Sequence, residues 1–359
     1  MWIKNPVVEQ QKDYTNLRYM GKAITEAGQP YVSWPHQNSW CDGSLVHQVY
    51  TAGPTHISTS SKIYIRSLDY RNTDIWGGST LVVDRLDEGC ICLGSGMAPN
   101  GDFVVHANAH SSGYTGKKFY HYRSTDKGQT WASEGEVNMP NANAEFIMSW
   151  QPTMDGSIIC SVYNTDNTMH FIRSTDNGYT WSVIPITNPY TFTRGPSNAG
   201  FLQLPDKTII AILRKNIGAT GYSSERDSAY FSISKDDGLS WTDIAVTDID
   251  DMTRTNASLI YHPDTNLVEV FYGSRYGQPE DGFGSIYQSV TTPELAKKGI
   301  FGTPKRLAKG ASYEMTSNSS DFAYPSVVRT PEGQVILTYY DLLSYHDGVT
   351  ETAIYMFRN

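Results

Sequence analysis

An eight-residue pattern that occurs three times constrains the fold of this 359-residue chain more than any other feature. The copies span residues 124–131, 174–181 and 234–241 and share the form S-x-D-x-G-x-[ST]-W. In each copy the Asp carboxylate can accept backbone N–H groups across a tight turn, the Gly supplies a positive φ, and the Trp covers the neighbouring layer. A degenerate fourth copy at residues 67–76 has a longer turn. We interpret the pattern as a structural turn and not as a catalytic site.

A second repeat, an acidic or amide turn that leads into an apolar strand, begins upstream of these turns. Asp-Gly and Asn-Gly between β-rich runs are the strongest short-range hairpin signal. Helical periodicity is nearly absent, and only residues 292–298 are expected to form a short helix, with a Pro near its first turn. The second repeat occurs six times, starting at Cys41, Pro99, Met154, Pro205, Pro263 and Pro331.

Six β-modules of about 50 to 68 residues match the radial repetition of four-stranded blades, which hides sheet edges. The sequence therefore predicts an all-β fold, a six-bladed β-propeller. A parallel β-helix would need much shorter rungs, and tandem sandwiches would need linkers that the sequence lacks. We expect residues 30–359 to form one propeller domain and residues 1–29 to be an N-terminal extension or a closing segment.

Composition excludes several classes of protein. The chain is 39% apolar and 12% aromatic, which is typical of a packed globule and not of a disordered chain. A formal net charge of −9 repels phosphate backbones, so nucleic acid is not an expected partner. No apolar run is long enough to span a bilayer, and the first residues lack the pattern of a signal peptide. The four scattered cysteines predict buried reduced thiols, with no metal and no cofactor.

The S-x-D-x-G-x-[ST]-W pattern resembles the Asp-box, or BNR repeat, of the sialidase (neuraminidase) superfamily. The likeness covers about residues 30–359 and implies the propeller fold, but the box also occurs in propellers that are not sialidases. The two arginines and the tyrosine of the family site match Arg214, Arg275 and Tyr324. Where the family has a Glu, this chain has Ser197 and Asn198, neither of which can act as a base for the tyrosine.

The resemblance implies a site for an acidic sugar. Arginine stays charged and binds carboxylates bidentately, so Arg214 and Arg275 are expected to hold the sugar carboxylate. The alternative for each is a strand-end arginine paired with a surface acid. Further substrate-binding candidates, each with a solvated or packing role as its alternative, are Arg194, Asn198, Arg254 and Trp34.

The catalytic candidates begin with Tyr324, which could attack an anomeric carbon if a carboxylate removed its proton. Asp321, three residues away, and Glu145, which opens another blade, could replace the missing Glu. His36 and His56 are candidate acids because imidazole titrates near neutrality. The tyrosine could equally serve in packing, and a lone histidine in a β-protein is more often structural.

The aromatic-Trp-Pro opening at residues 31–35 and the glycine-His loop at residues 53–56 resemble the tail-borne endosialidases of bacteriophages. This likeness implies a sialidase-like glycoside hydrolase on a phage tail, or an extracellular protein, that acts on an anionic oligo- or polysaccharide. It also implies a homotrimer for a longer parent chain. The alternatives are a non-catalytic receptor-binding head of a tail fibre and a structural propeller that binds a protein partner.

Overall fold

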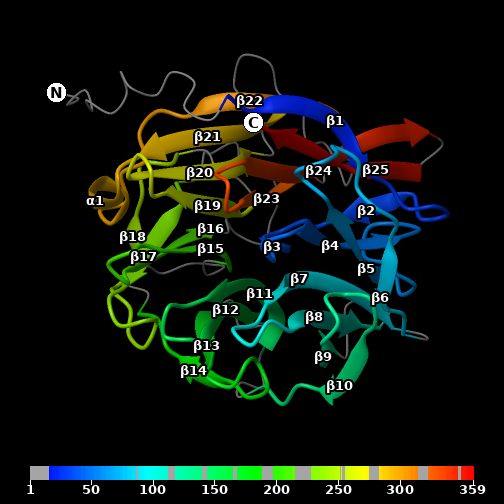
Figure 1. Cartoon of the computed structure of the whole chain (residues 1–359), viewed down its shortest axis with the longest axis horizontal. Helices are drawn as coiled ribbons and strands as arrows, with labels where there is room; N and C mark the ends of the chain where they lie inside the picture. Colours follow the sequence, from blue (N-terminus) through cyan, green and yellow to red (C-terminus); the bar gives the residue numbers. More distant parts are fainter. Residues whose placement is uncertain are drawn as a thin grey trace.

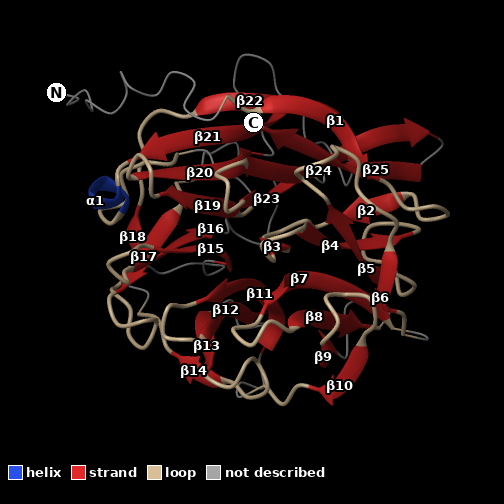
Figure 2. Cartoon of the chain, viewed as in Figure 1, coloured by secondary structure: helices blue, strands red, loops and turns tan. Residues whose placement is uncertain are grey.

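The computed structural model describes residues 16–85, 88–111, 118–139, 144–164, 168–187, 197–214, 228–250, 252, 255–274, 283–313, 322–346 and 349–359. Within these ranges the chain forms six antiparallel sheets, which follow one another in sequence order around a central axis (Figure 1). Figure 2 shows that strands make up almost all of the regular structure. The predicted all-β fold and six-bladed propeller are thus confirmed.

Each blade is one sheet that extends from an inner strand at the axis to an outer strand at the rim. From the inner to the outer strand, blade 1 contains β2 (Tyr31–Ser33) with β3 (Ser39–Cys41), β4 (Val46–Gly53), β5 (Lys62–Leu68) and β6 (Thr80–Val83). Blade 2 contains β7 (Gly89–Met97), β8 (Phe103–His110), β9 (Lys118–Ser124) and β10 (Ala132–Glu136), and blade 3 contains β11 (Ala144–Pro152), β12 (Ile158–Asn164), β13 (Met169–Ser174) and β14 (Ser182–Ile184).

The other three blades follow in the same order. Blade 4 contains β15 (Ser197–Gln203), β16 (Ile209–Arg214), β17 (Tyr230–Ser234) and β18 (Ala245–Val246), and blade 5 contains β19 (Ala257–His262), β20 (Leu267–Ser274), β21 (Phe283–Thr291) and β22 (Lys305–Tyr313). Blade 6 contains β23 (Ala323–Arg329), β24 (Val335–His346), β25 (Val349–Arg358) and β1 (Arg18–Ile24).

The ring is closed by β1, which completes the last blade. β1 pairs antiparallel with β25, so that Arg18 lies opposite Arg358. Thr352 of β25 then joins blade 6 to blade 1, since its hydroxyl accepts from the Val32 N–H (2.8 Å) and donates to the Val32 carbonyl (2.7 Å). Because both ends of the described chain belong to one sheet, backbone hydrogen bonds close the ring.

Polar side chains tie the inner strand of one blade to the next blade. The Asn108 amide of blade 2 donates to the carbonyl of Ile147 in blade 3 (3.2 Å), and its oxygen accepts from the Ile147 N–H (2.8 Å). These contacts satisfy backbone groups on an inner strand, beside which the described part of the chain forms no further strand. Contacts of the same kind join Thr51 with Cys92, Ser149 with Ala199, Asn256 with Pro325, and Ser258 with Val327.

The three Asp-boxes form the same turn between the third and fourth strands of blades 2, 3 and 4. In blade 3 the Ser174 hydroxyl accepts from the Gly178 N–H (2.8 Å) and donates to Asp176 (2.7 Å). The Asp176 carboxylate accepts from the Thr180 N–H (2.9 Å) and from the Thr180 hydroxyl (2.6 Å). Gly178 has a φ of 88°, a left-handed conformation that favours glycine. The box is therefore a structural turn, as the sequence indicated.

Replacing the box carboxylate should destabilise the whole propeller. We expect Asp176→Ala to lower the free energy of unfolding by about 1–3 kcal/mol, because the hydrogen bonds that Asp176 accepts are charge-assisted. The matched control is Thr175→Ala, an exposed residue of the same turn, which should change stability by less than about 0.5 kcal/mol. Urea unfolding measures both. Equal losses in the two variants would contradict the structural role of the carboxylate.

The short helix and three of the four cysteines agree with the sequence, whereas Cys41 is only half-buried. α1 (Pro293–Ala296) begins after Thr292, whose side chain caps it. All four cysteines are free; Cys90, Cys92 and Cys160 are buried, and burial raises the pKa of Cys90 and Cys92 to about 12. In the part of the chain that the structure describes, no helix has the length and the apolar character needed to cross a bilayer.

Two buried histidines contact each other beneath the Asp-box of blade 3, with their rings tilted by 37°. The ring centroids of His106 and His121 lie 4.3 Å apart, and Trp150 and Trp181 pack edge-on against His106 at 5.4 and 5.3 Å. Burial lowers the pKa of both histidines, that of His121 to about 3, and the charge of Arg123 lowers both further. Both rings are therefore neutral in the folded protein at neutral pH.

These histidines should make the fold sensitive to acid. An unfolded histidine takes up a proton near pH 6.5, whereas His121 in the folded protein does so only near pH 3. The stability that depends on a neutral His121 is therefore fully present above about pH 6.5 and is lost progressively as the pH falls toward about 3. Urea unfolding between about pH 7.5 and about pH 4.5 measures this slope, and His121→Phe, which cannot titrate, should reduce it. An unchanged slope would contradict the assignment.

Candidate functional site

Residues 34–38 interrupt the inner strand of blade 1 between β2 and β3. Trp34 and Gln37 have φ values of 54° and 51°, left-handed conformations that turn the chain out of the strand. The Gln37 amide donates to the Ala257 carbonyl of blade 5 (3.0 Å), and the Asn38 amide donates to the Cys92 carbonyl of blade 2 (3.1 Å). Because blade 5 is not a neighbour of blade 1, these contacts place the segment at the centre of the ring. We call residues 34–38 the axial segment.

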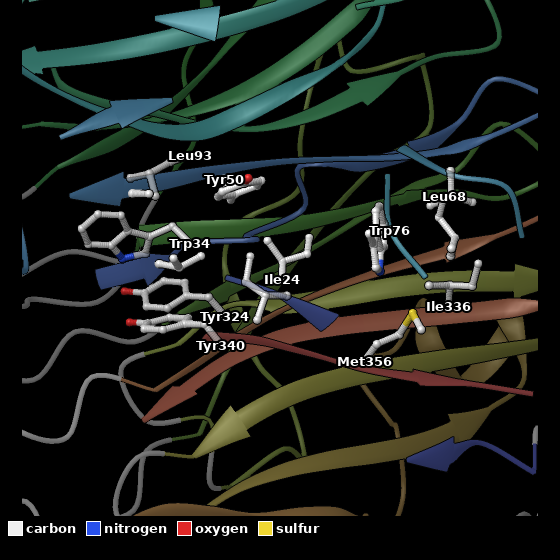
Figure 3. Close-up of a cluster of buried hydrophobic side chains, with 14 of the residues drawn as sticks. Ile24, Trp34, Tyr50, Leu68, Trp76, Leu93, Tyr324, Ile336, Tyr340 and Met356 are labelled. Atoms are coloured by element: carbon white, nitrogen blue, oxygen red, sulfur yellow. The ribbon is translucent and has the colours of Figure 1, made fainter. Parts of the chain in front are cut away.

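Tyr324 lies beside the axial segment and is the second residue of β23. Its φ of 44°, together with the φ of 86° at Ala323, coincides with a register shift in the pairing of β23 with β24. The ring stacks on Tyr340 at 6.0 Å and lies 5.4 Å from the His36 ring. Figure 3 shows the hydroxyls of Tyr324 and Tyr340 at the same end of this stack, next to Trp34. The tyrosine is 8% exposed, so packing fixes the direction of its hydroxyl.

Arg214 reaches Tyr324 from another blade. It is the last residue of β16 in blade 4, and it lies opposite Ser197 in the pairing with β15. Its Nη1 donates to the Tyr324 hydroxyl at 3.2 Å, although 110 residues separate the two in sequence. The structure thus brings together two of the three residues that match the family site.

His36 of the axial segment lies next to this pair and is fully buried. Burial lowers its pKa to about 4; its own backbone and that of Leu93 oppose the shift, and the charge of Arg214 adds to it. The imidazole is therefore neutral at neutral pH. The sequence suggested His36 as an acid that titrates near neutrality, and this suggestion is wrong because burial dominates.

His56 and Trp34 form a second part of the same region. The His56 side chain is exposed, and its Nδ1 lies 2.9 Å from the Tyr31 hydroxyl. The Trp34 ring packs 5.1 Å from the His56 ring and is 4% exposed. Trp34 therefore supports His56 from within the fold, whereas the sequence suggested it as an open surface for stacking on a sugar.

The strand order places the other described candidates on this face as well. Glu145, Asn198 and Tyr324 are each the second residue of an inner strand, in blades 3, 4 and 6. Inner strands of successive blades run in the same direction, so their first residues lie on one face of the propeller. Asn198 has a φ of 50°, close to that of Tyr324, and is 6% exposed. Glu145 is half-buried. We call this side of the ring the axial face.

Comparisons with known proteins agree with the fold. A family model described as a BNR repeat-like domain matches residues 59–337. The chain belongs to the BNR repeat-like family. No curated protein matches the sequence. The predicted resemblance to sialidase-like propellers is confirmed by this match and by similar solved structures.

Many solved structures, among them the following three, are similar to this BNR-repeat propeller. A protein of unknown function from Dyadobacter fermentans is 15% identical, with a TM-score of 0.70 over 95% of this chain and 98% of that one. A NanB sialidase mutant from Streptococcus pneumoniae is 12% identical, with a TM-score of 0.68 over 94% of this chain and 70% of the other. The phage phi92 endosialidase is 10% identical, with a TM-score of 0.69 over 96% and 69%. At these identities the likeness shows the fold alone.

Four candidates from the sequence, Arg194, Arg254, Arg275 and Asp321, lie outside the described residues. Among the residues that are described, no group of three or more His, Cys, Asp or Glu side chains could hold a metal ion. The sequence analysis missed the contacts of Gln37 and Asn38 across the axis. The only signal for them was the run of turn and amide residues after Trp34 in the axial segment.

The protonation state of His36 can be measured directly. We expect the His36 ring to titrate near pH 4, since burial is the main cause of its lowered pKa. Removing the nearby charge with Arg214→Gln should move the titration upward while leaving it below the ordinary 6.5. NMR of the protein with isotope-labelled histidine rings measures both, and His36→Gln identifies the resonance. A midpoint near 6.5 in the wild-type protein would show that the ring is solvated.

Proposed function

We propose that this BNR-repeat propeller binds an acidic, sialic-acid-like glycan at the axial face. The supporting observation is the Arg214 guanidinium, which the Tyr324 hydroxyl holds at the centre of the ring. A guanidinium stays charged, and its planar fork matches a carboxylate. His36 is neutral beside this pair, so Arg214 supplies the positive charge there. The sialidases and the endosialidase among the similar structures support the same ligand class.

The proposal extends to hydrolysis of a glycosidic bond. The Tyr324 oxygen attacks the anomeric carbon as its proton passes to a base, and the bond to the leaving oxygen breaks while that oxygen takes up a proton. Water then cleaves the tyrosyl-glycosyl bond and returns the phenol. Arg214 donates to the attacking oxygen and stabilises the charge that forms there. Glu145, Asp321 and His56 are the groups proposed to move the protons.

A non-catalytic glycan receptor is the second candidate, and one observation favours it. Ser197 and Asn198 occupy the position of the family's Glu, and both are buried. No carboxylate therefore stands at that position to take the tyrosine proton. In both versions of the proposal the protein is a phage tail or extracellular component, and the phage phi92 endosialidase among the similar structures supports the tail. We also propose a homotrimer for a longer parent chain.

Binding and cleavage can be separated with two substitutions. We expect Arg214→Lys to weaken retention on sialylated glycans or acidic capsular polysaccharides by about tenfold or more, because a bidentate charged contact is lost. Tyr324→Phe keeps the stacked ring and removes only the hydroxyl, so it should abolish cleavage while retaining most of the binding. Retention on immobilised glycan and chromatography of released or shortened sugar measure the two effects.

The controls lie on inner strands away from the axial face. The first control, Arg329→Lys, changes the last residue of β23, where the arginine donates to Asp264. The second control, Tyr261→Phe, removes a hydroxyl that donates to Asn266. Neither control should alter binding or cleavage. Retention without cleavage in the wild-type protein would favour the receptor, and absence of both would contradict the proposal in favour of a propeller that binds a protein partner.

A further inference from the structure

A pocket lies on the flank of the propeller, between β22 of blade 5 and the facing side of blade 6. It is an open depression of about 490 Å³, a volume within the range of pockets that hold small organic ligands. The wall from blade 5 contains the small residues Ala308 and Gly310. A Cβ at Gly310 would lie 2.9 Å from the Phe322 ring, so packing excludes a larger side chain at that position. The pocket therefore lies at the packing interface between blades 5 and 6.

The wall from blade 6 is a row of aromatic rings. Tyr339 lies opposite Tyr355 in the β24–β25 pairing, and Tyr19 lies opposite Phe357 in the β1–β25 pairing. The rings of Tyr339 and Tyr355 are 27° from parallel at 5.7 Å, and those of Tyr19 and Tyr355 are 16° from parallel at 6.4 Å. Tyr19 is 56% exposed and ends the row. Tyr19 is therefore the open ring of the row, whereas Tyr339 and Phe357 are buried behind it.

Polar groups of opposite charge complete the lining. Asp341 lines the pocket although it is only 5% exposed, and Lys309 lines it from the exposed side of β22. Burial and the charge of Asp341 raise the pKa of Tyr19 and Tyr355, that of Tyr355 to about 12, so these hydroxyls stay protonated. The pocket therefore offers donors and acceptors around an aromatic surface, with one positive and one negative side chain.

We propose that this flank pocket binds an uncharged pyranose saccharide. The apolar face of the sugar stacks on Tyr19, its hydroxyls donate to the Asp341 carboxylate, and a hydroxyl oxygen accepts from Lys309. Because Asp341 and Lys309 carry opposite charges, neither an acidic ligand nor an organic cation gains a net charge attraction from the lining. The strands of blades 5 and 6 line this pocket, and it shares no residue with the site proposed at the axial face, so it does not rest on the function proposed there.

The test uses the whole chain and defined probes. Saturation-transfer NMR with lactose, maltotriose and mannobiose in turn should detect binding of at least one of them, and titration gives its dissociation constant. Tyr19→Ala and Asp341→Asn should each weaken that binding by about tenfold, because they remove a stacking surface and a charged acceptor. The matched control is Tyr179→Ala, since Tyr179 is 55% exposed but lies on the Asp-box turn of blade 3. It should bind like the wild-type protein.

Several results would overturn the proposal. These are binding of none of the three saccharides, equal weakening by Tyr179→Ala and Tyr19→Ala, or binding of choline in place of the saccharides. Far-ultraviolet circular dichroism of each variant checks folding. Asp341→Asn changes no side-chain volume appreciably, so its effect is interpretable even if Tyr19→Ala disturbs the pairing of β1 with β25.

Discussion

Every blade of this propeller ends in an inner strand, and on its side toward the axis the described residues form no further strand for its backbone groups to pair with. An unpaired buried N–H or C=O costs about as much as a lost hydrogen bond, so a ring of six such strands is stable only if these groups find partners. Short polar side chains provide these partners. The Asn108 side chain hydrogen-bonds the inner strand of blade 3, the Asn256 side chain that of blade 6, and the Asn38 side chain that of blade 2. These contacts determine where blades meet and what can lie at the centre.

The axial segment follows from the same constraint. If β2 and β3 formed one continuous strand, blade 1 would contact only its two neighbours. Left-handed conformations at Trp34 and Gln37 instead carry amide donors to blades 2 and 5. The interruption also buries His36 beside the hydrogen-bonded pair of Arg214 and Tyr324, where a charged imidazole is unfavourable. The chemistry of the axial face therefore depends on the hydrogen bonding of inner-strand backbone groups as much as on which site residues are present.

The sequence predicted the parts of the fold that local rules control. The Asp-boxes, the hairpin turns and the helix after Thr292 each depend on residues close in the chain, and the spacing of the turns indicated the number of blades. The axial segment could not be predicted, because nothing in a sequence distinguishes an amide that crosses the ring from a solvated one. The contact between Arg214 and Tyr324 was anticipated only through family positions. The pKa of His36 was misjudged because burial is not a local property.

The two proposed sites differ in how they depend on the ring. The axial face is formed by strand ends from several blades, so its residues can change with little effect on the ladders that hold the blades together. The flank pocket is formed by strand faces, and one of its rings, Tyr19, belongs to β1. That strand is also the one that closes the ring through its pairing with β25. The flank pocket therefore exists only in the closed propeller, and its aromatic row is held by the same backbone pairing that joins the two ends of the described chain.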